Sequence, residues 1–259
     1  MIVTTPFKII IIVLFCLSNT KDRPIILHMS LQLMNMSKNA LCLQPMQEST
    51  QHIQRLIEEG EHQQLDFKFE ISDSKRIARS FAAFANTDGG RLLIGVKDNG
   101  AIAGIRSDEE LFMIEAAAEM YCQPPVLYST EEWEINGKTV LEVIIPKDDT
   151  GIKHKAPDNQ DNYKYFVRVR DKNIVANGIM LRIWKYKNNK ISAQIAFNDA
   201  ETLLLRHLNQ YETITQQTFQ NIAHINKKKA EAILCNFILM GTITMELSEK
   251  ETIFRLTDD

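Results

Sequence analysis

Two hydrophobic periods alternate along the chain from about residue 47 onward, and each predicts one kind of secondary structure. Ile53, Leu56 and Ile57 recur at the three- and four-residue spacing of a single helical face, and Gly60 suits the end of that helix. In the next stretch, LDFKFEI, apolar and polar residues alternate strictly. This second period predicts a half-buried strand over residues 65–71, directly after the helix.

A helix, a strand and a tight turn are predicted next. Ile77, Phe81 and Phe84 share one face of a helix. Its end is followed by two glycines, by the apolar strand RLLIGVK and by the dipeptide Asn99-Gly100. Because Asn-Gly favours a two-residue hairpin turn, the stretch AIAGI after it is predicted to return as the paired strand.

The same mixture of helices and strands continues to about residue 170. A helix over residues 108–121 is ended by two prolines, a second Asn-Gly turn at residues 136–137 joins two strands, and YKYFVRVR is a further alternating strand. The polar, turn-rich tract over residues 147–162 is predicted to be a loop. Residues 46–185 are therefore predicted to form one α+β domain, built on a mainly antiparallel sheet with flanking helices.

The C-terminal residues 199–259 have an organisation of their own. Three short helical patterns, the last of them capped by Asn226 and stopped by Gly241, are followed by a strand, a turn and a strand. Three helices before a β-hairpin is the element order of a winged helix-turn-helix. Residues 186–198 are predicted to be the linker between the two domains.

The first 45 residues follow neither pattern. Nine apolar residues come after Lys8, too few to cross a bilayer as a helix, which takes roughly 20. The length suits the core of a signal peptide, yet no A-x-A-like cleavage site follows. Three interpretations stay open for residues 1–45: a non-native extension before a true start at Met46, a targeting-like segment, or a structural arm.

The composition of the chain limits where the protein is expected to be found and what it is expected to bind. The 259-residue chain is 44% hydrophobic and 24% charged, which is ordinary for a soluble globular protein. Its formal net charge of -3 means that any contact with nucleic acid must come from local basic patches. The four cysteines form no CxxC pair and have no zinc-type spacing, which favours a reducing, cytoplasmic location with buried thiols. No stable membrane association is expected.

The glycine-rich stretch FAAFANTDGGRLLIGVKDNGAIAGI raises the question of a phosphate-binding loop. Such a loop needs its glycines ahead of a helix N-terminus, whereas here the helix precedes the glycines and a strand follows them. No GxxxxGKS or GxxxxGKT sequence occurs in the chain. Gly89 and Gly90 are therefore predicted to end the helix, and Gly95 and Gly104 to allow close packing.

Three carboxylates are candidates for catalysis or metal binding. Glu61 and Asp66 lie five residues apart across a helix-to-strand transition, and Asp98 lies at the end of a hairpin strand. Carboxylates from separate elements can hold one or two divalent cations, which activate water for phosphodiester hydrolysis. The alternative interpretation is that they are ordinary surface charges and turn formers.

Basic residues also lie along one predicted strand. Lys164, Arg168 and Arg170 have the even spacing of a single strand face, and Lys172 follows closely. A row of guanidinium and ammonium groups suits a phosphate backbone. A solvated sheet face explains the same spacing equally well.

Three lysines begin the third C-terminal helix, where a cation meets the positive end of the helix macrodipole at a cost of roughly 0.3–1 kcal/mol each. In a helix-turn-helix, the first residues of the recognition helix face the DNA. Against this, acidic residues outnumber basic ones from residue 200 on, and a winged helix can instead dock a protein. The candidate nucleic-acid-binding residues are Lys68, Lys153, Lys155, Lys164, Arg168, Arg170, Lys172, Lys227, Lys228 and Lys229.

The segments LDFKFE, IARSFAAFANTDGGRLLIGVKDNGAIAGI and YFVRVRDKNIVAN, in that order, resemble the AlbA-like DNA-binding domain of Schlafen proteins and bacterial "divergent AAA" regulators. The resemblance covers about residues 48–180 and implies a nucleic-acid-binding α+β domain. In Schlafen relatives a carboxylate trio forms a metal-dependent RNA endonuclease site, and Glu61, Asp66 and Asp98 match it by motif position. Asp66 stands where glutamate is commoner, and Arg170 stands where many members carry glycine.

Three functions are consistent with these features. The first is a cytoplasmic nucleic-acid-binding protein that acts as a DNA-binding transcriptional regulator. The sequence identifies no cofactor for this function. The alternative is a Schlafen-like RNA endonuclease that holds Mg²⁺ or Mn²⁺ with Glu61, Asp66 and Asp98. A further alternative is a protein-interaction module that binds no nucleic acid. DNA or RNA is the expected partner. The sequence leaves open the preference between them, the target sequence, ATP binding and a homo-oligomer.

Overall fold

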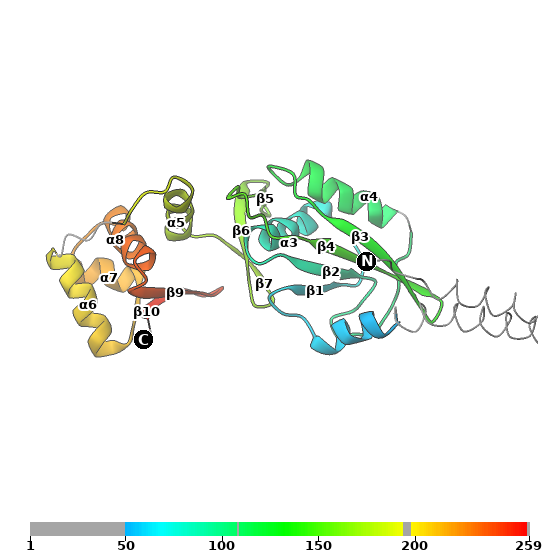
Figure 1. Ribbon diagram of the computed structural model, residues 1–259, viewed down its shortest axis with the longest axis horizontal. Coiled ribbons are helices and arrows are strands. Elements are labelled where there is room, and N and C mark those ends of the chain that lie inside the picture. The colour runs from blue at the N-terminus through cyan, green and yellow to red at the C-terminus, as the bar shows by residue number, and fades with distance from the viewer. Residues whose placement is uncertain (1–49, 108, 194–197, 258–259) are drawn as a thin grey trace, which may run out of the picture. The chain divides into compact units, whose positions relative to one another are not determined.

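Helices and strands make up most of the chain that this computed structural model describes, namely residues 50–107, 109–193 and 198–257 (Figure 1). The predicted extension 1–45 lies outside the described residues, and so do residues 194–197 of the predicted linker. Within the described ranges, no helix is long and apolar enough to cross a bilayer. The predicted α+β class on mainly antiparallel sheets is confirmed.

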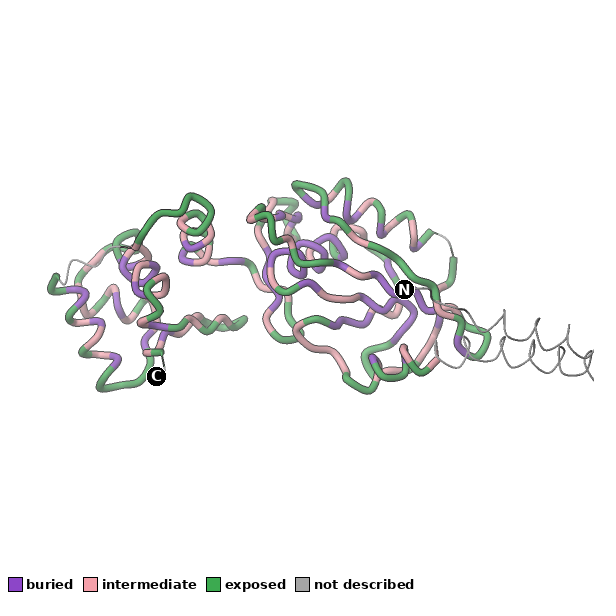
Figure 2. Tube along the Cα trace, in the orientation of Figure 1, coloured by how far each residue is buried: buried purple, intermediate pink, exposed green. Residues whose placement is uncertain are grey.

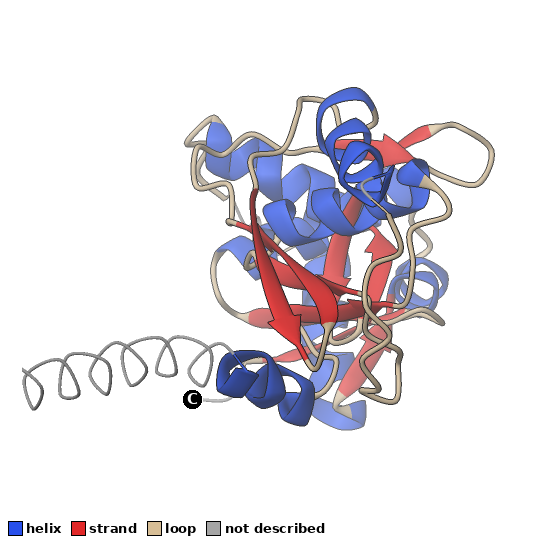
Figure 3. Ribbon diagram, turned by 90° about the vertical axis from the view of Figure 1, so that its right-hand side faces the viewer, coloured by secondary structure: helices blue, strands red, loops and turns tan. Residues whose placement is uncertain are grey.

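A four-stranded sheet lies at the centre of the N-terminal part, with the strand order β1-β2-β4-β3. The first pair is parallel, because helix α3 (Ser74–Asn86) carries the chain from β1 (Leu65–Lys68) back to the start of β2 (Gly90–Ile94). The other two pairs, formed by β4 (Lys138–Ile145) with β2 and with β3 (Ser129–Ile135), are antiparallel. Helices lie on both sides of these strands (Figure 3).

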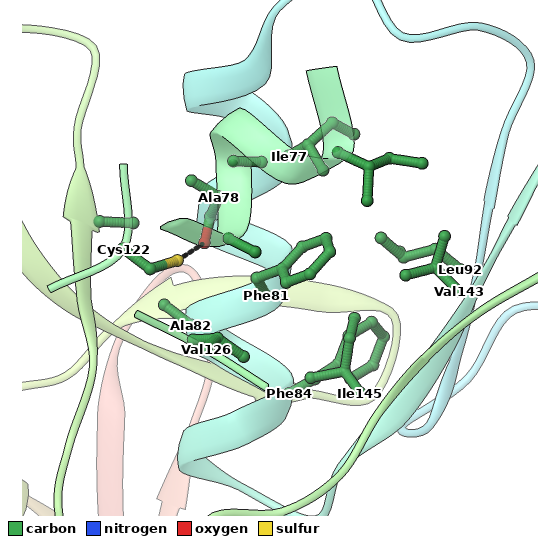
Figure 4. Packing of buried hydrophobic residues seen from close by; sticks show 14 of the residues in the cluster. Ile77, Ala78, Phe81, Ala82, Phe84, Leu92, Cys122, Val126, Val143 and Ile145 are labelled. Atoms are coloured by element: carbon green, nitrogen blue, oxygen red, sulfur yellow. Dashed lines mark hydrogen bonds between the residues drawn. The ribbon is translucent and has the colours of Figure 1, made fainter. Parts of the chain in front are cut away.

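Successive residues of β2 face two different cores. Leu92 and Ile94 pack in one core with α3, whereas Leu93 packs in another with the helix over residues 50–59 (blue in Figure 1). Phe81 and Phe84 of α3 lie close to the strands of the sheet in the first core (Figure 4). Burying a side chain of this size stabilises the fold by about 1.5–3 kcal/mol. Burial is therefore concentrated along α3 and the two central strands (Figure 2).

A second, antiparallel sheet packs on α3 through β5 (Lys155–Pro157), β6 (Tyr163–Val169) and β7 (Lys172–Val175). Strand β5 corrects the prediction of an uninterrupted loop over residues 147–162. A three-residue strand is too short to show a period, and β5 forms because its backbone pairs with β6. The N-terminal part therefore places the ends of two sheets beside the first turns of α3.

The two Asn-Gly turns differ from one another. At the second, Asn136 and Gly137 both have positive φ, 53° and 73°, as the hairpin between β3 and β4 requires. At the first, only Gly100 has a positive φ, 79°, and the predicted return strand over residues 101–105 is reduced to a single bridge. The chain leaves β2 there because the N–H of Ile105 donates to Thr139 O of β4 at 2.7 Å.

The glycines after α3 are structural, as predicted. A Cβ on Gly90 would lie 2.3 Å from the ring of Phe84, and a Cβ on Gly95 would lie 2.7 Å from the backbone of Gly104. Carbon atoms do not approach so closely, so each position needs a residue without a side chain. The glycine-rich stretch therefore joins α3 to the sheet and holds the next loop against it.

The helix predicted over residues 108–121 is present, but its second half is wider than an α-helix. It runs as α4 (Glu109–Glu115) and continues as a π-helical turn, η1 (Ala116–Met120). Residue 108 itself lies outside the described residues. Helices α3 and α4 and the turn η1 share the first core.

The C-terminal part has its own core. Three helices followed by two strands are present over residues 199–257, as predicted, with a short strand paired to the second of them. Helix α5 (Gly178–Asn188) also belongs to this core, because Ile179 and Ile183 are buried in it, whereas the predicted division places most of α5 in the first domain. The remaining elements are α6 (Asp199–Tyr211), β8 (Thr213–Thr215), α7 (Gln216–Ala223), α8 (Lys227–Leu239), β9 (Ile243–Leu247) and β10 (Thr252–Leu256).

Candidate nucleic-acid interface

Two carboxylates lie side by side where the chain enters β1. Glu61 Oε1 accepts a hydrogen bond from the backbone N–H of Phe67 at 2.9 Å, which brings Glu61 toward the buried side chain of Asp66. Burial raises the pKa of Glu61, and the hydrogen bond and negative charge of Asp66 add to this rise, although the Phe67 N–H opposes it. Two of the three predicted catalytic residues are therefore neighbours.

Asp66 already has two cations beside it. Lys68 Nζ lies 2.7 Å from Asp66 Oδ2, and Arg168 Nη2 lies 3.4 Å from Asp66 Oδ1. In residues 50–107, 109–193 and 198–257, no group of three or more His, Cys, Asp or Glu side chains is placed to hold a metal ion. The Lys68 ammonium lies on the side of Asp66 where a divalent cation would bind it, so a bound cation would have to displace Lys68.

Asp98 lies on the exposed turn beyond β2, and it shares one hollow with Glu61 and Asp66. This hollow, of about 310 Å³, is called the acidic hollow here because acidic side chains outnumber basic ones in its lining. The fold therefore gathers the predicted trio around one space without bringing the three carboxylates together as a metal centre.

A second hollow, of about 380 Å³, shares part of the lining of the first and is called the basic hollow. Arg76 and Arg79 of α3 line it, as do Lys68 and Lys172. Neither arginine is predicted from the sequence as a site residue. Both lie on the polar face of α3, and only the apolar face of this helix was used to predict it. One feature of the sequence could have indicated a basic site here: the first turn of α3 has two basic residues and no acidic one.

Arg168, one of the predicted phosphate-binding residues, is buried, with 2% of its surface exposed. Its side chain donates to Asn173 Oδ1 at 3.1 Å and to the carbonyl oxygens of His62 and Leu65 at 3.3 and 3.2 Å. The even spacing with Lys164 is real, but that strand face is covered by α3 except at the end that carries Lys164. Arg168 therefore ties β6 to β1.

The turn between β6 and β7 presents Arg170 and Lys172. Arg170 has a φ of 57°, the left-handed conformation that glycine adopts most easily, and its side chain is exposed. Lys172 Nζ lies 3.8 Å from Asp171 Oδ2 and lines both hollows. Of the predicted residues on this segment, Lys172 is thus the one at the shared edge of the two hollows.

The other predicted basic residues of the N-terminal part line neither hollow. Lys153 is half-buried against the ring of Trp184, and desolvation lowers its pKa. Lys155 lies over the ring of Tyr165, 5.0 Å from its centroid. Lys164 is exposed at the start of β6.

In the C-terminal part, Lys227, Lys228 and Lys229 are exposed in the first turn of α8, after the N-cap Asn226. Lys227 Nζ lies 4.0 Å from Glu231 Oε1, a separation at the outer limit of an ion pair. The structure therefore leaves the charges of all three lysines at the surface.

Comparison with known proteins yields one family model and a set of similar solved structures that includes the two described below. The family model described as Schlafen, AlbA_2 matches residues 61–177. No curated protein matches the chain. The crystal structure of the DIP2311 protein from Corynebacterium diphtheriae is similar at 17% identity with a TM-score of 0.37, covering 75% of this chain and 34% of that one. The chain therefore spans about a third of the length of DIP2311.

The second structure is the solution NMR structure of the N-terminal domain of an ATP-dependent DNA helicase RecG-related protein from Nitrosomonas europaea. It is 22% identical, with a TM-score of 0.32, and the match covers 50% of this chain and 95% of that domain.

Proposed function

We propose that the protein binds nucleic acid and acts as a DNA-binding transcriptional regulator in the cytoplasm, on the premise that residues 61–177 match the Schlafen, AlbA_2 family model. The observation that carries the proposal is the basic hollow, where five basic side chains face three acidic ones in a protein of net charge -3. A local excess of this kind attracts a phosphate backbone even when the whole molecule is acidic.

The C-terminal part supports the regulatory side of the proposal. Helices α6, α7 and α8 followed by the β9–β10 hairpin have the element order of a winged helix-turn-helix. We propose that α8 is its recognition helix and that Lys227, Lys228 and Lys229 contact DNA phosphates. Their exposure is consistent with that role.

The test is a binding titration of the full chain against single- and double-stranded DNA and RNA at about 50 and about 500 mM salt. Affinity that falls steeply between the two salt concentrations is expected. A variant with Lys227, Lys228 and Lys229 all changed to alanine should bind duplex DNA more weakly while its binding of single strands changes less. Equal binding at both salt concentrations, or no binding at either, would contradict the proposal.

A second candidate function is a Mg²⁺- or Mn²⁺-dependent RNA endonuclease. It is favoured by the adjacent Glu61 and Asp66 carboxylates and by the presence of Asp98 at the same hollow. It is opposed by the Lys68 ammonium against Asp66. Cleavage of labelled tRNA in the presence of Mn²⁺, measured for wild type and for Asp98→Ala, tests the nuclease. Asp149→Ala, at an exposed position, is the control. Cleavage lost only in Asp98→Ala would establish the nuclease; its persistence there would exclude this site.

A third candidate is a protein-interaction module that binds no nucleic acid. A second copy of the chain is one partner for such a module. The same titrations address it. A stable oligomer that binds no nucleic acid at either salt concentration would favour the module over the regulator.

A further inference from the structure

The acidic and basic hollows are joined, and the charge along them is uneven. They share the side chains of Asp66, Lys68, Arg76, Asp171 and Lys172. Six acidic side chains line the acidic hollow against three basic ones, whereas five basic side chains line the basic hollow against three acidic ones. An anion entering this surface is therefore drawn toward the Arg79 side and repelled from the Glu61 side.

The acidic residues of the basic hollow are already engaged. Asp66 lies between Lys68 and Arg168, as described above. Asp158 Oδ1 accepts hydrogen bonds from the backbone N–H groups of Gln160 and Asn162 at 2.8 and 2.9 Å. The pairs with Asp66 also occupy Lys68 and Arg168, so Arg76, Arg79 and Lys172 are the basic side chains of the hollow that remain for a ligand.

Arg76 differs from the other arginines of the hollow. Arg79 is fixed, because its Nε donates to Pro157 O at 2.7 Å and its Nη1 donates to Asn159 Oδ1 at 2.6 Å. Arg76 is exposed, forms no hydrogen bond or ion pair with any described residue, and lines both hollows. Its guanidinium is therefore free to accept a ligand in the two-pronged geometry that suits phosphate oxygens.

Arg76 lies in the first turn of α3, a helix of 13 residues. The N-terminus of this helix is already capped by the carboxylate of Asp73, which accepts a hydrogen bond from Lys75 N at 2.9 Å and lines only the acidic hollow. The attraction for an anion at the basic hollow therefore comes from the Arg76 guanidinium, not from the helix end.

A buried guanidinium completes the hollow. Arg168 lines it with 2% of its surface exposed, and its Nε has no hydrogen-bond partner among the described residues. A buried charged group with an unsatisfied donor is costly, and a nearby anion would reduce that cost.

We propose that the basic hollow is a phosphate-binding subsite for nucleic acid and that Arg76 is the residue that contacts the phosphate group. The proposal rests on nucleic-acid binding as the function of the AlbA_2 domain, and it identifies the group of the ligand that this domain holds. The phosphate belongs either to the end of a chain or to an internal phosphodiester, two sources with the same chemistry.

The test measures binding of the full chain to a short single-stranded RNA that carries either a 5′-phosphate or a 5′-hydroxyl. Arg76→Gln should weaken binding about tenfold and Arg76→Lys less, because lysine keeps the charge but loses the fork. Lys75→Gln is the matched control: Lys75 precedes Arg76, pairs with Asp161 and lines neither hollow. It should change affinity less than about twofold.

Loss confined to the 5′-phosphorylated RNA assigns a terminal phosphate, and equal loss on both RNAs assigns an internal one; either supports the subsite. Unchanged binding by Arg76→Gln, or an equal loss in Lys75→Gln, overturns it. Inorganic pyrophosphate tests the subsite apart from nucleic-acid binding, since it should raise the unfolding temperature of wild type but not of Arg76→Gln. If pyrophosphate does so while no RNA or DNA binds, the subsite stands and the proposed function fails. If it stabilises both proteins equally or neither, the subsite fails.

Discussion

Asn86 belongs to the AFANTDGG stretch that carries the family resemblance, and its role in the structure is to hold the second sheet on α3. Its Nδ2 donates to His154 O at 2.8 Å and to Phe166 O at 2.9 Å, while its Oδ1 accepts from the N–H of His154 at 2.8 Å. Only 5% of the residue is exposed. One side chain thus satisfies backbone groups beside β5 and within β6.

Replacing Asn86 with alanine should destabilise the protein by about 3 kcal/mol or more, because three buried polar groups lose their partner. Chemical denaturation of the full chain measures this loss. Asn99→Ala is the control, since Asn99 is exposed and accepts one hydrogen bond from Ala101 N; its loss should stay below about 1 kcal/mol. Similar losses in the two variants would contradict the structural role of Asn86.

Arg170 shows the opposite case, a residue whose backbone conformation favours a different amino acid. Its φ of 57° is one that glycine reaches without a steric penalty. Arg170→Gly relieves this strain but increases the conformational entropy of the unfolded chain. The net effect should leave the free energy of unfolding unchanged or raise it by up to about 1 kcal/mol. Thermal unfolding compares it with Lys164→Gly in β6, which should lose about 0.5–1 kcal/mol. A clear loss at Arg170 would show that its side chain stabilises the turn.

At the scale of elements, α5 decides where the C-terminal core begins. Its Ile179 and Ile183 are buried with residues of α8, and Cys235 of α8 is fully buried in the same cluster. The family match ends at residue 177, directly before α5. No helix is predicted over residues 178–188 from the sequence, so the predicted domain boundary at residue 185 falls inside α5.

Ile183→Ala should destabilise the C-terminal core by about 2–4 kcal/mol, because a buried side chain is replaced by a cavity. This loss should make the Cys235 thiol react faster with a labelling reagent. Mass spectrometry of the peptide that contains Cys235 measures the rate of labelling. Leu181→Ala on the exposed side of the same helix is the control. Equal labelling of Cys235 in both variants would mean that α5 does not cover this core.

At the scale of the whole molecule, basic groups available to a ligand occur in two separate regions of an acidic protein. Arg76, Arg79 and Lys172 lie at the basic hollow, and three lysines lie at the start of α8. Lys68 and Arg168 are excluded from this set because they pair with Asp66. The net charge of -3 therefore says little about nucleic-acid binding, which depends on these local groups.

If all six groups contact duplex DNA, the logarithm of the binding constant should fall with the logarithm of salt concentration with a slope of about -5. The slope should shrink to about -3 when Lys227, Lys228 and Lys229 are changed to alanine. Fluorescence anisotropy over a salt series measures both slopes. An unchanged slope in the triple variant would remove α8 from the DNA interface and leave the basic hollow as the binding surface.

The sequence by itself determined the features that depend on near neighbours along the chain. The helical period defines α3, the Asn136-Gly137 pair defines the β3–β4 hairpin, and alternation defines β6. Each is decided within a few residues, because caps, turns and periodicity act over that distance. Glu61, Asp66 and Asp98 were candidates because they are carboxylates on separate predicted elements and match the family's trio by motif position, whereas the fold places them around one hollow.

Only the tertiary structure decided which charges face solvent and which core covers each element. Alternation places Arg168 and Lys164 on one face of β6, but α3 covers that face and turns Arg168 into a buried link. Arg76 reaches the basic hollow because α3, β1 and the β6–β7 turn converge there from distant parts of the sequence. A period identifies the faces of an element, whereas burial depends on what packs against each face, and that information lies in the fold as a whole.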